Sequence, residues 1–469
     1  MKIELENKRT LVVGAGMSGK SAVKLLVAKG AQVTVTDKKP LPRPSPDELK
    51  GEFQWRCGDQ ETVMEENWDF IVISPGVPPN LPALVGARDR GSVIIGEIEL
   101  GYNFISHKIV AITGTKGKST TTKLVGDMLK ASGMRPFVGG NIGLPLCELA
   151  LSPAAYDIAV LELSSFQLET LVNFRAEVAV LLNIAPDHLD RYPDMESYAA
   201  AKGELFRRIT ESGAIVIPEE GKYLDRILKE APKRRFTFGR EDKGQRCAFR
   251  IGSDSFTMRI DAEPFNYSVG SPSLGGNYNM ENAMSAALAA RLCGASPEAI
   301  QQTLNNFVGL SHRRQFVMEF GEVQFYNDSK ATNVFSAAST LRSFPAQRNI
   351  ILIVGGMLKE KELSELTEAA KGRVKRALCI GRDGGQIFAA LKNIVASEEA
   401  GNMENAVKRA FEVADAGDIV LLSPATASFD AYNNYAERGE HFSRLVRERG
   451  RPVTAKLSVV KKERREDER

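Results

Sequence analysis

Short apolar runs rich in valine, isoleucine and leucine alternate along nearly the whole chain with segments of helical periodicity. The first run, T-L-V-V at 10–13, is followed by a glycine turn, a helical pattern to Gly30 and the run Q-V-T-V-T at 32–36. Further runs of this kind occupy 68–74, 93–97, 108–113, 157–163, 176–183, 349–356 and 418–424. Strands that alternate with helices in this way are typical of parallel α/β units.

The length of the chain, 469 residues, exceeds what one ordinary hydrophobic core supports, and we expect three α/β domains. The outer two are expected to be Rossmann-like. The central one should contain a small antiparallel portion near 245–270, where apolar and polar residues alternate. The predicted domains cover 1–98, 99–310 and 311–457, followed by a tail at 458–469 whose last nine residues are all charged.

The composition is that of a folded protein, with 43% hydrophobic and 26% charged residues. A net charge of +3 gives no indication of a nucleic-acid-binding surface. The five cysteines are scattered and form no C-x-x-C motif, which favours a reducing compartment. Because the N-terminus has no signal-peptide pattern and no apolar run reaches the roughly 18 residues of a membrane span, we expect a cytoplasmic protein that does not bind membranes.

The first glycine turn, from Gly14 to Gly19, matches G-x-G-x-x-G between a strand and a helix, and Asp37 closes the next strand. This is the fingerprint of a fold that places a nucleotide diphosphate on a helix N-terminus. The motif does not specify a nicotinamide. The alternative is a tight strand-to-helix turn that binds no ligand.

A second glycine loop, G-T-K-G-K-S at 114–119, nearly matches the standard phosphate loop G-x-x-x-x-G-K-[ST]. The standard pattern requires its first glycine at position 112, which is Ile112. If the loop binds a nucleotide, Lys118 would place a cation on the terminal phosphates, and the hydroxyl of Ser119 or Thr120 could reach a magnesium ion. A bare turn before a helix is the alternative, but it would not require a lysine followed by hydroxyl residues.

Two candidate polar residues lie at the ends of neighbouring apolar runs: Glu162 ends D-I-A-V-L-E at 157–162, and His188 comes shortly after the run at 176–183. Ligands of parallel sheets gather at the carboxyl ends of the strands, where the second glycine loop also lies. A carboxylate there suits magnesium, although either residue taken alone could be structural. The polar segment N-D-S-K-A-T-N at 327–333 also exceeds what a helix N-cap needs.

The shortened loop G-T-x-G-K-[ST] resembles the ATP loop of the Mur ligases and the folylpolyglutamate synthetases. The resemblance covers essentially the whole chain, because further motifs follow in the family's order. These are G-G-N-I-G (139–143), L-E-L-S-S-F-Q-L (161–168), D-H-L-D-R-Y (187–192), N-Y-N-M-E-N-A (277–283) and S-H-R-R (311–314). Residues 327–333 and 423–439 resemble the marks of the members that add D-glutamate.

The resemblance implies an ATP- and magnesium-dependent monomeric ligase of cytoplasmic peptidoglycan precursor synthesis. Its substrates would be UDP-N-acetylmuramoyl-L-alanine and D-glutamate, joined through an acyl phosphate. The alternatives are another member of the family, such as the L-alanine-adding ligase, and, from other classes, an NAD-dependent oxidoreductase or a non-catalytic nucleotide-binding module.

The resemblance also assigns roles to residues. Those implied in catalysis are Lys118, Glu162, His188 and Lys202, the last as a carbamylated lysine. Magnesium would be held by Ser119, Thr120, Glu162, His188 and carbamylated Lys202. ATP would be bound by Gly114, Thr115, Lys116, Gly117, Lys118, Ser119, Thr120, Asn282, Arg313 and Asp328. The UDP substrate would be bound by Gly16, Met17, Ser18, Asp37, Lys39, Ser74, Pro75, Gly76 and Asn141. D-glutamate would be bound by Lys330, Thr332, Lys359, Ser428 and Tyr435.

The chain departs from the family pattern at a few of these positions. Lys116 stands where a small polar residue is common, and Tyr278 stands where a histidine usually precedes the asparagine near the adenine. Lys39 replaces an arginine, which keeps the charge and loses the bidentate fork. Lys359 lacks the usual Asp-Gly before it. Without carbamylation, Lys202 is expected to be an ordinary residue on a helix surface.

Overall fold

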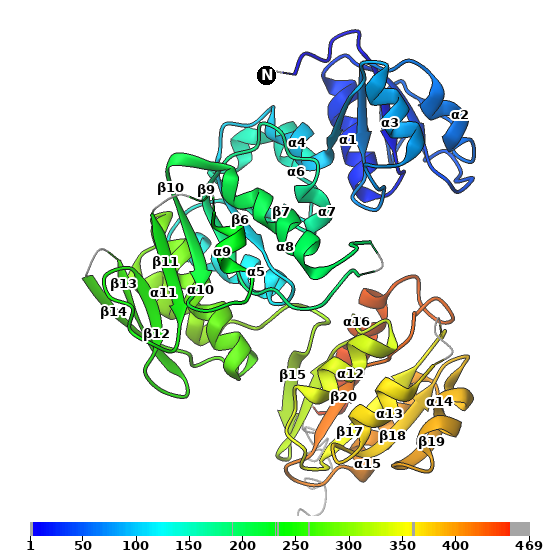
Figure 1. Cartoon of the computed structure of the whole chain (residues 1–469). Helices are drawn as coiled ribbons and strands as arrows, with labels where there is room; N and C mark the ends of the chain where they lie inside the picture. The colour runs from blue at the N-terminus through cyan, green and yellow to red at the C-terminus, as the bar shows by residue number, and fades with distance from the viewer. Residues whose placement is uncertain are drawn as a thin grey trace, which may run out of the picture. The chain divides into compact units, whose positions relative to one another are not determined.

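The computed structural model describes residues 3–189, 191–229, 231, 234–260, 263–358 and 362–450. The chain divides into two compact units, Met1–Phe307 and Val308–Arg469, called unit 1 and unit 2 below. Unit 1 contains a first sheet and a central sheet, and unit 2 contains one sheet (Figure 1). The predicted tail at 458–469 lies outside the described residues, and the three domain boundaries drawn from the sequence stay predictions.

The first sheet is fully parallel, with the strand order β3-β2-β1-β4-β5. Its strands are β1 (Arg9–Val13), β2 (Gln32–Thr36), β3 (Gln54–Trp55), β4 (Phe70–Ile73) and β5 (Val93–Gly96). Its helices are α1 (Met17–Ala28), α2 (Gln60–Glu65), α3 (Pro82–Asp89) and α4 (Glu97–Tyr102). Successive residues of β1 point to opposite faces, so that Val12 joins the core under α1 and Leu11 joins the core under α2 and α3. Both faces are covered, which explains the continuous apolar runs in the sequence.

The central sheet has the order β14-β13-β12-β11-β10-β9-β6-β8-β7. Its strands are β6 (Lys108–Thr113), β7 (Pro136–Gly140), β8 (Ile158–Glu162), β9 (Ala176–Leu181), β10 (Ile209–Pro218), β11 (Arg235–Gly239), β12 (Cys247–Arg250), β13 (Ser255–Ile260) and β14 (Glu263–Ser268). Strands β12, β13 and β14 pair antiparallel, which confirms the antiparallel portion predicted near 245–270.

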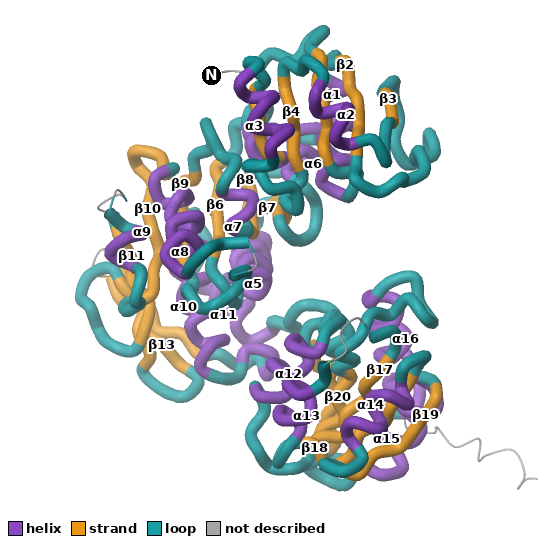
Figure 2. The backbone as a smooth tube through the Cα atoms, turned by 45° about the vertical axis from the view of Figure 1, so that its right-hand side comes forward, coloured by secondary structure: helices purple, strands orange, loops and turns teal. Residues whose placement is uncertain are grey.

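Helices cover both faces of the central sheet (Figure 2). One face packs against α5 (Lys118–Ala131), α10 (Asn277–Leu292) and α11 (Pro297–Asn306). Short helices lie over the other face: α6 (Leu146–Leu151), α7 (Ser165–Leu168), α8 (Met195–Gly203) and α9 (Leu224–Ile227). The 3-10 helices are η1 (Pro153–Ala155), η2 (Glu204–Arg207) and η3 (Pro272–Leu274).

The strand order of the central sheet places a topological switch point at β6. Strand β6 pairs in parallel with β8 on one side and with β9 on the other. The chain segments that follow these three strands therefore meet at one edge of the sheet. In parallel sheets this carboxyl edge is where ligands bind.

Unit 2 is a six-stranded sheet with the order β15-β16-β20-β17-β18-β19, in which only the edge strand β15 runs antiparallel to its neighbour. The strands are β15 (Gln315–Phe320), β16 (Val323–Asn327), β17 (Ile350–Gly355), β18 (Val374–Ile380), β19 (Ala396–Gly401) and β20 (Ile419–Leu422). Helices α12 (Val334–Arg342), α13 (Ser364–Ala370) and α14 (Gly384–Leu391) cover one face, and α15 (Met403–Val413) and α16 (Tyr435–Arg449) cover the other. The predicted α/β fold class is confirmed. No helix in the described part of the chain is both long enough and apolar enough to cross a membrane.

Candidate active site

The second glycine loop lies between β6 and α5, as the sequence predicts. Gly114 and Gly117 have φ angles of +149° and +86°, a region that favours glycine. A Cβ atom at Gly117 would lie 2.2 Å from Oδ1 of Asn282, so a larger residue has no room there. Asn282, predicted near ATP, is buried and accepts a hydrogen bond at 3.3 Å from Thr121 Oγ1 of α5. Its side chain therefore packs directly behind the loop.

Asn183, just beyond β9, holds the apex of the loop and was missed by the sequence analysis. Its side-chain Oδ1 accepts from the Lys116 N–H at 2.9 Å, and its Nδ2 donates to the Lys116 carbonyl at 3.0 Å. Its own carbonyl accepts from the Thr115 N–H at 3.0 Å. Thr115 Oγ1 lies 3.1 Å from Tyr198 Oη of α8. The loop is thus shaped by two elements distant in sequence.

Lys118 and Lys202 meet at one backbone carbonyl. The Lys118 ammonium donates to the carbonyls of Gly114 and Thr115, each at 2.9 Å. The Lys202 ammonium donates to the same Gly114 carbonyl at 3.0 Å. The expectation that unmodified Lys202 lies on a helix surface is wrong, because its side chain is only 1% exposed beneath the loop. Burial lowers the pKa of Lys202 well below its usual range, and the nearby Lys118 charge lowers it further.

Glu162, at the carboxyl end of β8, is buried next to the central strand β6. Its Oε1 accepts from Asn141 Nδ2 at 2.8 Å. Its Oε2 is buried and has no hydrogen-bond partner among the described residues. A buried carboxylate oxygen without a partner is costly, and a cation would satisfy it. Asn141, predicted near the UDP substrate, is therefore also the residue that orients Glu162.

His188 follows β9, on the other side of β6 from Glu162. Its backbone has φ +54°, and its ring packs 4.8 Å from the Phe166 ring, measured between centroids. Ser119 is buried in the first turn of α5, and Thr120 beside it is half-buried. Within the part of the chain that the structure describes, no three His, Cys, Asp or Glu residues lie close enough to hold a metal by themselves. The predicted metal ligands stay a prediction. A magnesium ion bound mainly through phosphates and water needs few protein ligands.

The first glycine turn also has the predicted geometry. Gly14 has φ +102°, and Gly16 caps the N-terminus of α1. The Asp37 carboxylate accepts from the backbone N–H groups of Ala15 and Lys39, both at 2.9 Å. It therefore braces the turn in this structure. Met17, at the start of α1, is 68% exposed, and Ser18 next to it is half-buried.

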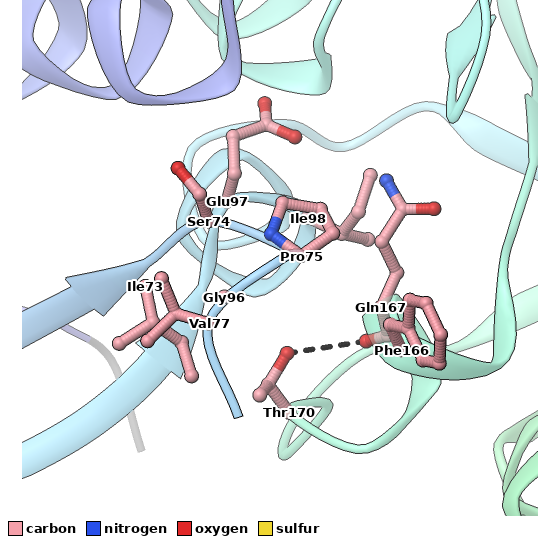
Figure 3. Close-up of a pocket in the computed structure, with 10 residues that line it drawn as sticks. All are labelled: Ile73, Ser74, Pro75, Val77, Gly96, Glu97, Ile98, Phe166, Gln167 and Thr170. Atoms are coloured by element: carbon pink, nitrogen blue, oxygen red, sulfur yellow. Dashed lines mark hydrogen bonds between the residues drawn. The ribbon is translucent and has the colours of Figure 1, made fainter. Parts of the chain in front are cut away.

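The Ser74–Pro75–Gly76 turn packs on the first glycine turn, because Ser74 Oγ donates to the Gly14 carbonyl at 3.1 Å. A small cavity lies between this turn and α7 (Figure 3). Its lining includes Ser74, Pro75, Glu97, Phe166, Gln167 and Thr170. The turn predicted to hold the UDP substrate and the segment that follows Glu162 therefore line the same cavity.

In unit 2 the polar segment 327–333 begins at the last residue of β16. Asp328 is buried, accepts from the Arg314 N–H at 3.0 Å and from Ser423 Oγ at 2.9 Å, and burial raises its pKa to about 6. The Lys330 ammonium lies 5.6 Å from the centroid of the Tyr435 ring, which brings two of the predicted D-glutamate residues together. Ser428 is buried, Thr332 is half-buried and Arg313 is exposed. The predicted residue Lys359 lies outside the described residues.

Arg438 of α16 organises this region and was also missed. It is 1% exposed and donates to Ser329 Oγ, the Ser329 carbonyl and the Thr426 carbonyl, each at 3.0 Å. Burial lowers the pKa of its guanidinium to about 10. One buried cation therefore ties the 327–333 segment to the segment after β20. The only available signal was its place within the 423–439 motif.

Three family descriptions match successive parts of the chain. Residues 8–96 match the Mur ligase MurD-like N-terminal domain, residues 112–290 the Mur ligase middle domain, and residues 294–426 the Mur ligase glutamate ligase domain. These matches follow the order of the first sheet, the central sheet and unit 2.

Curated relatives match over nearly the full length. The UDP-N-acetylmuramoylalanine–D-glutamate ligase of Acidobacterium capsulatum is 41% identical over 95% of this chain and 97% of its own. The ligase of the same name from Anaeromyxobacter dehalogenans is 42% identical over 96% of this chain and 99% of its own.

Solved structures share the fold at lower identity. UDP-N-acetylmuramate-alanine ligase from Thermotoga maritima is 18% identical, with a TM-score of 0.54 over 94% of this chain and 99% of that one. UDP-N-acetylmuramoyl-L-alanyl-D-glutamate–2,6-diaminopimelate ligase is also 18% identical, with a TM-score of 0.56 over 95% of this chain and 93% of that one. On the identity and coverage of its curated relatives, the chain belongs to the Mur ligase family.

Proposed function

We propose that this chain is an ATP- and magnesium-dependent ligase that joins D-glutamate to UDP-N-acetylmuramoyl-L-alanine. The structural observation that carries the proposal is the carboxyl edge of the central sheet. There the shortened glycine loop of β6, with Lys118, lies between Glu162 on β8 and the His188 segment after β9. The curated relatives named for this reaction support the choice of substrates.

The reaction joins an acid and an amine at the expense of ATP. The carboxylate of the alanyl group attacks the γ-phosphorus of ATP, giving an acyl phosphate and ADP. The amine of D-glutamate then attacks the acyl carbon, and phosphate and the amine proton leave as the amide forms. The first step brings two anions together, and each pair of unit charges 4 Å apart costs about 4 kcal/mol at an effective dielectric of 20. Lys118 offsets this repulsion when its ammonium exchanges the loop carbonyls for phosphate oxygens.

Magnesium fits the residues at this edge. Ser119, Thr120, Glu162 and His188 are the proposed ligands, and the unpartnered Oε2 of Glu162 supports a cation there. Bound magnesium would supply further positive charge against the phosphates. The chain's own contribution is to hold these groups: Asn141 orients Glu162, and Asn183 shapes the loop.

Lys202 is proposed to be carbamylated. A lysine reacts with carbon dioxide as the neutral amine, and the buried position of Lys202 beside Lys118 favours that form. The product would carry an anionic group able to support a second metal ion. A carbamate signal in carbon-13 NMR with labelled bicarbonate, lost in Lys202→Arg, is expected. The same spectrum for both proteins would contradict the modification.

The remaining substrate contacts are proposed from the resemblance to the family. The UDP substrate is proposed to bind Gly16, Met17, Ser18, Asp37, Lys39, the 74–76 turn and Asn141. D-glutamate is proposed to bind Lys330, Thr332, Ser428 and Tyr435, since two carboxylates need cations and hydroxyl donors. The product would be a peptidoglycan precursor made in the cytoplasm by a monomeric enzyme.

The function is tested by phosphate release with a panel of L- and D-amino acids and two acceptors, UDP-N-acetylmuramate and UDP-N-acetylmuramoyl-L-alanine. Release is expected only when D-glutamate and the alanyl acceptor are both present, with an amide product of matching mass. Release with UDP-N-acetylmuramate and L-alanine would assign the chain to the other reaction instead.

A further inference from the structure

Arg191, in the loop between β9 and α8, joins the first sheet to the central sheet within unit 1. One guanidinium nitrogen, Nη1, donates to the Pro75 carbonyl at 3.1 Å. The other, Nη2, donates to Glu169 Oε2 at 2.7 Å, just after α7. The guanidinium also lies 4.0 Å from the centroid of the Phe166 ring, and its side chain is 16% exposed. A planar guanidinium held by two acceptors and a ring has little freedom to turn.

The bond to Pro75 fixes the orientation of the 75–76 peptide. This peptide is trans, because the described residues contain no cis bond. In a planar trans peptide the C=O and the N–H point in opposite directions. The Pro75 carbonyl points to Arg191, so the Gly76 N–H points away from it. Among the described residues no group accepts a hydrogen bond from the Gly76 N–H. The turn therefore presents an open donor at the ligand edge of the first sheet.

Through Glu169, Arg191 is also connected to the phosphate loop. Glu169 also accepts from the hydroxyl of Tyr192, whose ring lies 5.4 Å from the ring of Tyr198, measured between centroids. Tyr198 in turn contacts Thr115 of the phosphate loop at 3.1 Å. A continuous set of contacts thus runs from the 74–76 turn to the loop. Pro75 and Phe166 both line the cavity whose residues are drawn in Figure 3.

We infer that Arg191 is a positioning residue for the nucleotide-linked substrate. It aims the Gly76 N–H at the substrate's diphosphate and holds the turn at a fixed distance from the phosphate loop. This inference rests on the proposed function. If the ion pair were merely structural, its removal would lower stability without changing substrate affinity.

The test measures binding of UDP-N-acetylmuramoyl-L-alanine by calorimetry without ATP, followed by steady-state kinetics, in Arg191→Ala. Loss of a charge-assisted contact that orients a donor is expected to raise the Kd and the KM of this substrate about tenfold. The KM of ATP is expected to change less than about twofold, because the phosphate loop keeps its other contacts. In Arg191→Lys the cation reaches only one of the two acceptors, so the rise should be intermediate.

Arg135→Ala is the matched control. Arg135 likewise bonds a carbonyl, that of Ala154 at 3.1 Å, and a carboxylate, that of Asp157 at 2.6 Å, but at the amino ends of β7 and β8. Its removal is expected to leave the Kd of the UDP substrate unchanged. An unchanged Kd in Arg191→Ala, or equal rises for both substrates, would overturn the inference. If Arg191→Ala does not fold, Arg191→Lys decides by the same criterion. Absence of turnover in the unaltered protein would instead refute the proposed function.

Discussion

At the scale of single residues, ionisable side chains are buried at the phosphate loop, in unit 2 and at the start of α4. Lys202 and Glu162 lie at the phosphate loop, Arg438 and Asp328 lie in unit 2, and Glu97 lies at the start of α4. Each is almost completely withdrawn from water, and burial of a charge is costly unless a partner compensates. Lys202, Arg438 and Asp328 have hydrogen-bond partners for their charged groups. In Glu162 and Glu97, by contrast, one carboxylate oxygen has no partner among the described residues.

Glu97 provides a prediction on the pH dependence of stability. Its Oε1 accepts from the Cys147 N–H at 2.7 Å, and burial raises its pKa to about 7, helped by the nearby Glu148. Because the folded state binds this proton more tightly than the unfolded state, stability falls as pH rises from about 4.5 to about 7. The loss amounts to about 3 kcal/mol at most. Glu97→Gln keeps the acceptor and removes the charge.

Glu97→Gln is therefore expected to be more stable than the unaltered protein at pH 8 and equally stable near pH 4.5. Denaturant titrations of both proteins at the two pH values measure the difference. A stability difference that is the same at both pH values would show that Glu97 does not titrate as described.

The burial of Lys202 shows what a residue's local sequence does not reveal. Its neighbours Y-A-A-A-K-G form an ordinary helical segment, and the contact that buries it is with Gly114, 88 residues earlier. Arg191 and Pro75 are likewise 116 residues apart. The motifs predicted the types of functional residue and the strands that they follow. They did not predict which side chains contact each other, because those contacts depend on the order of the strands in space.

The phosphate loop is the element on which the chemistry depends, and its glycines are not interchangeable with alanine. In Gly117→Ala the new Cβ would clash with Asn282 Oδ1 at 2.2 Å, and a φ of +86° strains any residue with a side chain. We expect kcat/KM for ATP to fall more than about tenfold as the loop shifts.

Gly133→Ala is the control that introduces backbone strain without a steric clash. Gly133 follows the other end of α5, has φ +87°, and has nothing within 4 Å of the added Cβ. It is expected to cost about 1 kcal/mol of stability and leave kcat/KM for ATP within about twofold. Equal kinetic losses in the two variants would mean that the loop is not the ATP site.

At the scale of elements, the apolar runs of the sequence predicted nine of the strands, and the motifs predicted both glycine turns. Apolar runs such as that of β8 are buried on both faces and so read clearly as strands. Helix α4 was less readable. It lies where a domain boundary was expected, yet its residues Glu97 to Gly101 are buried, and the Glu99 carboxylate accepts from the N–H groups of Val172 and Phe174. Its burial follows from packing between distant segments.

For the whole molecule, the alternation of strands and helices predicted the α/β class, and the structure, which contains three sheets, confirms that class. The alternation does not predict that β6 lies between β8 and β9, since sequence order and spatial order differ there. That order creates the ligand edge of the central sheet. The family relationship adds the reaction that this edge serves.

The most direct measurement is ADP release driven jointly by UDP-N-acetylmuramoyl-L-alanine and D-glutamate in Lys118→Ala. Lys123→Ala is the control, because Lys123 lies on the same helix and pairs with Asp127 at 2.8 Å, away from the loop. Loss of a cation against developing phosphate charge is expected to lower turnover more than about a hundredfold in Lys118→Ala, and Lys123→Ala should retain nearly full activity. Turnover in Lys118→Ala within about tenfold of the unaltered protein would contradict the assignment of this loop as the site of phosphate transfer.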